Sequence, residues 1–202
     1  MKKRILLLLT LLALTACSTT HRELVGQADH GQVASLIQEH GYFDLISRSA
    51  DGTIKWQETN VPNALANEGE YLIQDVMFRG NTPPTQYYLR LYNATPTLTS
   101  TLTTLAANEP ATANGYAPAS QGITRDATGW PLVPQLVTSH YEITSKTITI
   151  TASGGTIGPV TYAALATSSD NTGKLIAYAA LSTTRTLQIG DSLAMTYKIR
   201  LQ

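Results

Sequence analysis

Hydrophobic and polar residues alternate along much of the chain after residue 41, and this pattern predicts β-strands. In the run 192–201 every odd-numbered position carries a leucine, isoleucine, methionine or tyrosine, and most even-numbered positions are polar. The run 86–92 has the same period, with Tyr87, Leu89 and Leu91 on one face and Arg90 on the other. A period of two is expected of a strand that buries one face.

Shorter β-like runs separated by turn residues fill most of the remaining sequence. The turns contain Asp51-Gly52, Gly154-Gly155, Asn171-Thr172-Gly173 and Gly190-Asp191. The runs between them are 42–49, 53–59, 120–125, 141–151, 160–167, 174–181 and 184–188. Several short strands without interleaved helices predict a mainly β fold, an antiparallel β-sandwich, in a single domain over residues 42–202.

One short helix is expected, at about residues 67–78. Asn67 and Glu70 form a capping-box-like start, and Gly80 provides a stop signal. The spacing of Leu72, Ile73, Val76 and Met77 places these four residues on the inner face of the helix.

Residues 95–115 predict a long loop that carries recognition. The segment is rich in Thr, Ala, Asn and Pro and has leucine only at positions 98, 102 and 105. Long loops without periodicity are often functional, so we expect Tyr92 and Tyr116 to act as aromatic anchors at its two ends. Trp130 is a third aromatic candidate for binding. The alternative is that the tyrosines are core residues with a hydroxyl at the rim.

The first sixteen residues predict a secretory signal peptide. A basic start precedes an apolar stretch that is shorter than the roughly 20 residues of a membrane-spanning helix. Leu14-Thr15-Ala16-Cys17 resembles the bacterial lipobox. The resemblance implies that Cys17, the only cysteine, is lipidated, and that Ser18, the next residue, directs the product to the outer membrane. The sequence leaves both the periplasmic side and the cell-surface side of that membrane open. An ordinary secreted protein with a chance cysteine is the alternative.

Residues 17–41 predict a flexible, lipid-anchored tether. Val33, Leu36 and Ile37 fit one face of a marginal helix. Three histidines at positions 21, 30 and 40 match no compact metal-ligand spacing, so no metal site is expected.

Charge limits the classes of partner. The 14 basic and 14 acidic residues balance, and loss of three bases with the leader leaves 11 against 14, a net charge of −3. The absence of basic runs argues against nucleic-acid binding. The membrane, envelope proteins and glycans remain candidate partners, and a homo-oligomer is compatible with the sequence.

The sequence contains no recognised catalytic constellation. It has no G-x-S-x-G, Walker, HExxH or Rossmann pattern, and no cofactor is expected. Ser169-Asp170-Asn171 fits a hairpin turn, Glu68 and Glu70 fit the positive end of a helix, and His140 fits a strand start. The chain is therefore expected not to be an enzyme, although an unrecognised hydrolase is a third alternative.

The order of several motifs resembles a group of tailed-phage structural proteins. The motifs are the DG-x-I-x-W hairpin at 51–56, Pro62-Asn63, the helix start at Gly69, the YLRLY strand at 88–92, Gly115-Tyr116, the segment 127–131 and the "GD-x-L" turn at 190–193. The resemblance covers about residues 42–202. It implies a β-sandwich virion component of the tail-fibre or head-decoration kind, without catalytic residues.

These observations favour a non-catalytic virion structural or attachment module that is exported as a lipoprotein. The alternative is an outer-membrane lipoprotein whose sandwich binds a glycan or a partner protein. The corresponding locations are the outer membrane and the virion.

Overall fold

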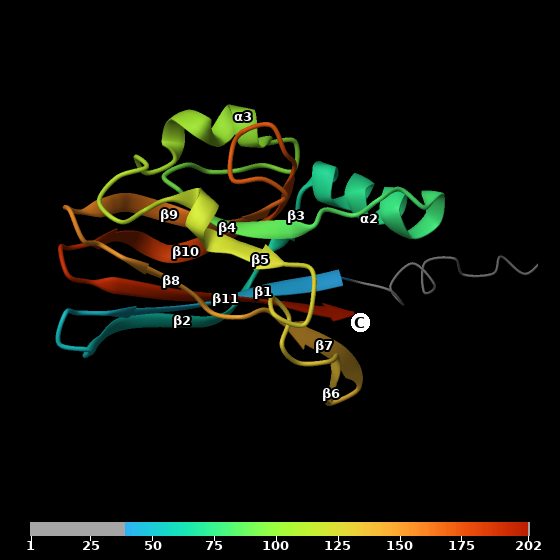
Figure 1. The fold of residues 1–202 in the computed structure, drawn as a ribbon, viewed down its shortest axis with the longest axis horizontal. Coiled ribbons are helices and arrows are strands. Elements are labelled where there is room, and N and C mark those ends of the chain that lie inside the picture. Colours follow the sequence, from blue (N-terminus) through green and yellow to red (C-terminus); the bar gives the residue numbers. More distant parts are fainter. Residues whose placement is uncertain (1–38, 202) are drawn as a thin grey trace, which may run out of the picture. The chain divides into compact units, whose positions relative to one another are not determined.

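Two antiparallel sheets stack face to face in the part of the chain that the computed structural model describes, residues 39–201 (Figure 1). The first sheet has the order β2-β1-β11-β7-β6, with β8 also paired to β11, and consists of β1 (Glu39–Arg48), β2 (Ile54–Pro62), β6 (Gln135–Val137), β7 (His140–Thr144), β8 (Ile148–Thr151) and β11 (Ser192–Leu201). The second has the order β3-β10-β9-β4-β5 and consists of β3 (Ala64–Leu65), β4 (Gln86–Tyr92), β5 (Gly122–Thr124), β9 (Ile157–Ala166) and β10 (Leu175–Leu187). The predicted mainly β sandwich is confirmed.

The first hairpin forms as its turn residues predict. Gly52 adopts a φ of 87°, and the Asp51 carboxylate accepts hydrogen bonds from Ser49 Oγ at 2.6 Å and Thr53 N at 2.9 Å. These bonds, the one from Ser49 above all, lower the pKa of Asp51 to about 2. An ionised side chain as well as glycine therefore stabilises the turn of this hairpin.

The two clearest predicted strands are observed with their predicted bounds, as β4 and β11. Leu193, Met195 and Tyr197 of β11 are buried between the sheets. Leu201 was expected to face inward but is 54% exposed, because it is the last residue of the strand and lies beyond the core.

Two other strand predictions need correction. The run 141–151 is interrupted at Ser145, whose Oγ accepts a hydrogen bond from Tyr197 N at 2.9 Å, so that β7 and β8 pair separately with β11. Conversely, the runs 174–181 and 184–188 join into the single strand β10, which contains register shifts. Both differences arise from pairing with distant strands, which local composition does not encode.

The helix α2 (Asn67–Arg79) is close to the prediction and ends at Gly80, which has a φ of 72°. The predicted capping box is wrong, because Ala66 occupies the N-cap and no side chain caps the helix. Glu68 instead accepts a hydrogen bond from Leu175 N at 2.9 Å, across to β10. The first turn of α2 is thus attached to the second sheet.

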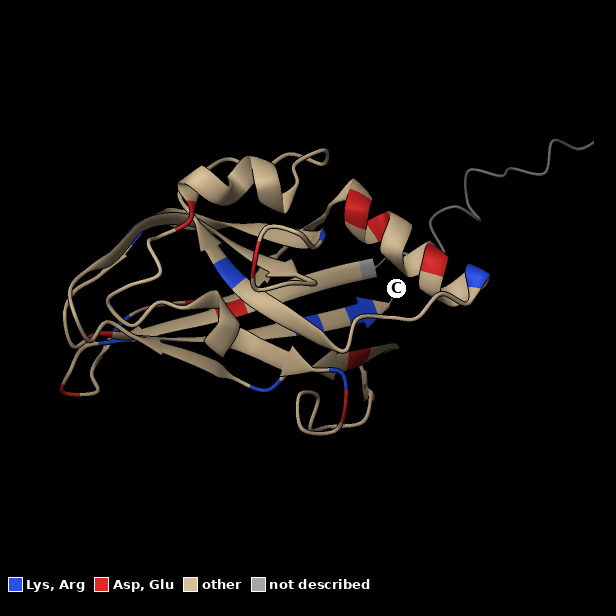
Figure 2. Ribbon diagram, turned by 45° about the horizontal axis from the view of Figure 1, so that its top comes forward, with Lys and Arg blue, Asp and Glu red and all other residues tan. Residues whose placement is uncertain are grey.

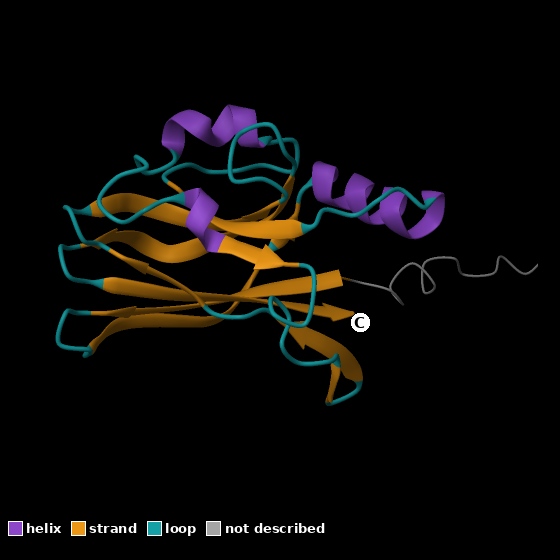
Figure 3. Ribbon diagram, viewed as in Figure 1, coloured by secondary structure: helices purple, strands orange, loops and turns teal. Residues whose placement is uncertain are grey.

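Residues 95–115 were expected to form a loop, but the segment contains α3 (Leu102–Leu105) and η1 (Ala106–Asn108) (Figure 3). Thr101 and Thr104 form a reciprocal capping box, with Thr104 N donating to Thr101 Oγ1 at 3.2 Å. Leu102 and Leu105 are buried in a second hydrophobic cluster with Tyr92, on the face of β4 that points away from the main core. This part of the segment is a structural cover, not an open loop.

A further short helix, η2 (Pro118–Gln121), leads into β5. The described strands begin at Glu39, so residues 39–41 belong to β1 and not to the predicted tether. The predicted signal peptide, Cys17 and the marginal helix at 33–37 lie outside the described residues.

Candidate functional site

An apolar cavity of about 330 Å³ opens where α2 meets one end of the two sheets. Its walls come from α2, from both sheets and from the segment after β5. The lining residues are Leu72, Ile73, Val76 and Met77 of α2; Ile143, Tyr197 and Ile199 of the first sheet; Leu65, Tyr87, Leu165 and Ile176 of the second; and Arg125 and Trp130 from the segment after β5. The volume lies within the range of about 300–1,000 Å³ typical of ligand pockets.

The position of α2 depends on a close approach of backbones. A Cβ at Gly69 would lie 2.3 Å from the carbonyl oxygen of Ile176, so only glycine lets the helix lie this near to β10. Beyond this first turn the helix extends past the sheet, and its later apolar residues form the outer wall of the cavity.

Four side chains with a polar group, those of Tyr87, Arg125, Trp130 and Tyr197, line this otherwise apolar cavity. The Tyr197 hydroxyl accepts a hydrogen bond from Asn63 Nδ2 at 2.9 Å, and Arg125 Nε donates to the carbonyl oxygen of Pro84 at 3.1 Å. Burial raises the pKa of Tyr87, against the opposing effect of the Arg125 charge. The cavity suits an apolar group, and its described walls contain no carboxylate or histidine that could serve as an acid or base.

Trp130 is brought to the cavity by a tight turn after β5. The Asp126 carboxylate accepts hydrogen bonds from Thr124 Oγ1 at 2.7 Å and Gly129 N at 3.0 Å, and these bonds lower its pKa. Trp130 then packs edge-on against Tyr87, with ring centroids 6.4 Å apart. Of the three aromatic candidates from the sequence, this is the one at the cavity.

Tyr92 and Tyr116 are buried, with 0% and 1% of their surface exposed. The Tyr116 hydroxyl donates to Glu109 Oε1 at 2.7 Å and accepts from Leu91 N at 3.1 Å. Burial, more than the nearby Glu109 charge, raises the pKa of Tyr116 well above its ordinary value. Both tyrosines are therefore core residues, and neither lines the cavity at which Trp130 lies.

Arg90, at 1% exposure, forms the centre of a buried polar cluster with these groups. Its Nε and Nη2 donate to the two carboxylate oxygens of Glu109, and its Nη1 donates to the carbonyl oxygen of Asp170 at 2.6 Å. Nη2 also donates to Asn171 Oδ1 at 3.0 Å. The cluster fastens the 168–173 turn and the 102–116 segment to β4, which is a structural role.

No group of three or more His, Cys, Asp and Glu side chains suited to a metal ion occurs within residues 39–201. His140 lies at the start of β7, with its Nε2 3.0 Å from Ser139 Oγ. Within the same residues no helix is long and apolar enough to cross a membrane.

Residues 64–199 match the protein family described as Podophage GP4 fiber I protein gp80. The chain belongs to this family. The match begins at β3 and ends within β11, so it includes α2, the whole second sheet and every residue that lines the cavity. No curated protein matches the chain.

The exposure of several large apolar residues of this fibre-family chain was not anticipated from the sequence. Met77 was expected on the inner face of α2 and does line the cavity, yet it is 68% exposed because the cavity is open there. Phe78 is 80% exposed and Val133 74%. The signal that could have revealed them is the excess of large apolar residues over what one helix face or one hairpin face can bury.

Proposed function

We propose that the protein is a non-catalytic fibre component of a phage virion, with a structural or attachment role. Membership of the fiber I family is the observation that supports this proposal most directly, since the match includes two thirds of the chain. The open apolar cavity and its exposed rim favour contact with another macromolecule over turnover of a substrate. Other virion proteins are the proposed partners.

The proposal includes export as a lipoprotein. Leu14-Thr15-Ala16-Cys17 supports cleavage before Cys17 and acylation of its sulfur and new amino group, and Ser18 supports the outer membrane as destination. Several acyl chains, at about 0.8 kcal/mol per buried methylene, anchor a protein far more firmly than one chain does.

Mass spectrometry of the native N-terminus, combined with fractionation of cells and phage particles, tests both parts. The expected result is a mature chain that begins at a lipid-modified Cys17, together with copies of the protein in purified particles. A chain that keeps Met1 and occurs only in particles would refute export and leave the fibre role standing. A chain that never occurs in particles would refute the fibre role.

The anchor itself is tested by Cys17→Ser. The thiol is the only acyl-transfer nucleophile of its kind in the sequence, so the variant should lose the lipid mass and move to the soluble fraction. Ser18→Ala is the matched control, since it leaves the thiol in place and should remain lipidated. Membrane retention of Cys17→Ser with unchanged mass would contradict the lipobox interpretation.

The lipobox favours one alternative, an outer-membrane lipoprotein whose sandwich binds a glycan or an envelope protein. Neighbouring genes distinguish the two: tail and capsid genes support the fibre role, and envelope genes support the alternative. An unrecognised hydrolase would be revealed by substrate turnover that a single polar substitution abolishes.

A further inference from the structure

The cavity beside α2 runs from solvent into the core between the two sheets. At its open side Met77 has 68% of its surface exposed, and Arg125 is exposed as well. Its innermost walls include Leu165, Ile176 and Tyr197, which are all buried. The cavity therefore has an exposed mouth and a deep apolar interior, and such a pocket can enclose most of a small ligand.

The walls of the cavity suit a hydrocarbon chain better than a peptide. Most of the lining side chains are those of Leu, Ile, Val and Met, and the Tyr197 hydroxyl in the interior already accepts a hydrogen bond from Asn63 at 2.9 Å. A peptide carries an N–H and a C=O at nearly every residue, and each of these groups needs a partner when it is buried. A hydrocarbon chain has no such groups, so these walls can bury it without loss of a hydrogen bond.

One cation lies at the mouth of the cavity. Arg125 is the single charged residue among the described residues that line it. Its Nε donates to the carbonyl oxygen of Pro84 at 3.1 Å, and its backbone N–H donates to that of Thr85 at 2.9 Å, which holds the residue in place. Its two terminal nitrogens make no hydrogen bond or ion pair with another described residue, whereas Arg200 of β11 pairs with Glu142 at 2.6 Å. The guanidinium is therefore available to an anion.

We propose that the cavity binds a medium-chain aliphatic carboxylate, such as decanoate, with its hydrocarbon chain against the apolar walls and its carboxylate on Arg125. The two Nη groups of Arg125 can donate to the two oxygens of one carboxylate, which is the strongest geometry for such a pair. The carboxylate stays at the mouth in contact with water, so no unpaired charge enters the interior. The cavity volume of about 330 Å³ is near the lower limit for ligand pockets, which favours a single short chain over a phospholipid with two chains.

The distribution of charge favours this position for the anion. Charged residues are scattered over the fold and do not gather into a broad basic face that would bind anions elsewhere (Figure 2). On α2, Asp75 pairs with Arg79 at 2.9 Å and also accepts a hydrogen bond from Asn81, so its charge is compensated locally. The described walls of the cavity contain no carboxylate. A carboxylate at the mouth is therefore attracted by Arg125 and repelled by no residue that lines the cavity.

Trp130 supplies the reporter for a binding experiment, because it lines the cavity and the only other tryptophan, Trp56, does not. Trp56→Phe leaves Trp130 as the single tryptophan of the full chain. The chain is made from Met1 by cell-free translation without membranes or detergent, since both carry acyl chains that would compete. Titration with hexanoate, octanoate and decanoate should change the fluorescence, with an affinity that rises about fourfold for each methylene, the equivalent of about 0.8 kcal/mol. An affinity that does not depend on chain length would overturn the proposal.

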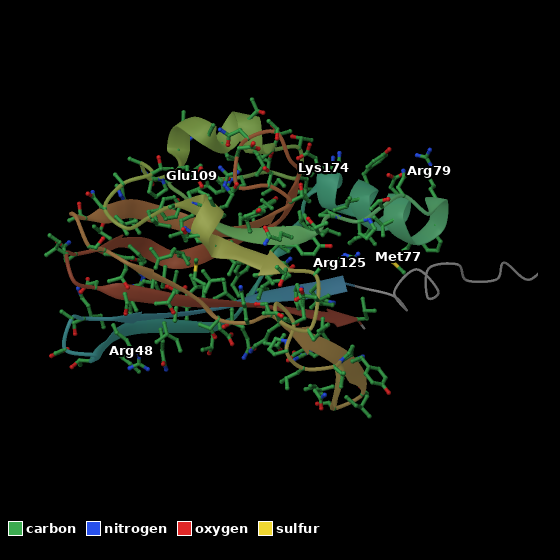
Figure 4. All side chains as sticks on the ribbon, in the orientation of Figure 1. Arg48, Met77, Arg79, Glu109, Arg125 and Lys174 are labelled. Carbon is green, nitrogen blue, oxygen red and sulfur yellow. The ribbon has the colours of Figure 1, made fainter. Side chains whose placement is uncertain are left out.

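Arg125→Gln tests the position of the carboxylate. Loss of a hydrogen bond to a charged group should weaken decanoate binding about tenfold, whereas binding of the uncharged decanol should not change. Arg48→Gln is the matched control, because Arg48 also lacks an ion pair and lies at the other end of the sheets from Arg125 and Met77 (Figure 4). It should alter the binding of neither ligand. Unchanged decanoate binding by Arg125→Gln, or an equal loss for decanoate and decanol, would overturn the proposal.

Val76→Phe tests the position of the hydrocarbon chain. The larger side chain fills part of the cavity and should weaken decanoate binding roughly tenfold or more, as expected when two methylenes lose their place. Ile54→Phe, at an exposed residue of β2 that does not line the cavity, should leave binding unchanged. Unaltered circular dichroism and melting temperature exclude misfolding as the cause, and Arg125→Gln, at an exposed side chain, remains decisive if Val76→Phe does not fold.

Three results would each overturn the proposal: no binding of decanoate, unchanged binding by folded Val76→Phe, or tighter binding of the capped peptide acetyl-Leu-Leu-Phe-amide than of decanoate. The proposed ligand occupies only the interior of the cavity and leaves the exposed side chains at its rim to other virion proteins. None of these outcomes therefore bears on the fibre role.

Discussion

Glu109→Gln tests whether the buried cluster around Arg90 holds the 102–116 segment against β4 of the second sheet. The substitution preserves the shape of the side chain but removes the negative charge that faces the guanidinium. Arg90 and Glu109 have side-chain exposures of only 1% and 10%, so water cannot replace the lost carboxylate effectively. The Tyr116 hydroxyl, which donates to Glu109 at 2.7 Å, keeps an acceptor in the amide oxygen.

The expected loss of stability is large for a single substitution. Removal of one partner of a buried ion pair costs about 3–5 kcal/mol, because it leaves an uncompensated charge in the interior. The retained amide contacts place Glu109→Gln near the lower limit, about 3 kcal/mol. For a domain of this size, 1 kcal/mol shifts the melting temperature by roughly 2–4 °C, so a decrease of about 6–12 °C is expected.

Urea unfolding followed by circular dichroism measures the effect, with Arg79→Gln as control. Arg79 also pairs with a carboxylate, but its side chain is 68% exposed, and loss of such a surface pair costs about 0.5 kcal/mol or less. Arg90→Met combined with Glu109→Gln removes both charges and should be more stable than Glu109→Gln alone. A cost for Glu109→Gln no greater than that of the control would refute the buried-charge argument.

The remaining predictions concern packing and acid stability. Leu102→Ala should lower the free energy of unfolding by about 2–5 kcal/mol, as expected for a buried leucine, whereas Leu98→Ala, at a residue that is 53% exposed, should change it little; equal effects would contradict the observed burial. Gly69→Ala should displace α2, since its Cβ would lie 2.3 Å from a backbone oxygen, and should destabilise the protein far more than Gln74→Ala, a comparison that thermal melting can make. Hydrogen bonds from the turn lower the pKa of Asp170 to about 2, so its stabilising effect is present above its unfolded pKa of about 3.9 and disappears as the pH falls toward 2. Melting curves between pH 5 and 2 should therefore decline less for Asp170→Asn than for the unmodified protein, and parallel curves would show that the turn contributes nothing.

Local sequence patterns were sufficient to predict strands and turns where one face of the sheet is buried and the turn residues are distinctive. Strand β11 and strand β4 could be predicted with their bounds, because period-two alternation is a direct consequence of strand geometry. Gly52 and Gly80 marked a turn and a helix end, since both positions adopt a positive φ that suits glycine. The fold class followed from these elements alone.

The burial of polar residues and of loop-like segments could not be predicted from local sequence patterns. Arg90 lies on the face of β4 that alternation assigns to solvent, yet Glu109 and the turn at 170–171 cover it. The leucines of α3 are spaced too sparsely to form a periodic signal, and only their contact with the outer face of β4 makes them core residues. Each outcome depends on what another segment places over the residue.

The sequence by itself therefore determined the class of fold, the best strands and the motif order that resembles phage structural proteins. Only the tertiary structure decided where the candidate site lies, because the cavity brings Leu65 of β3, Val76 of α2, Trp130 and Ile199 of β11 to one end of the sheets. Residues that are more than a hundred positions apart become neighbours through strand pairing and helix docking. Those contacts are long-range, and periodicity, which reports only on nearby residues, carries no record of them.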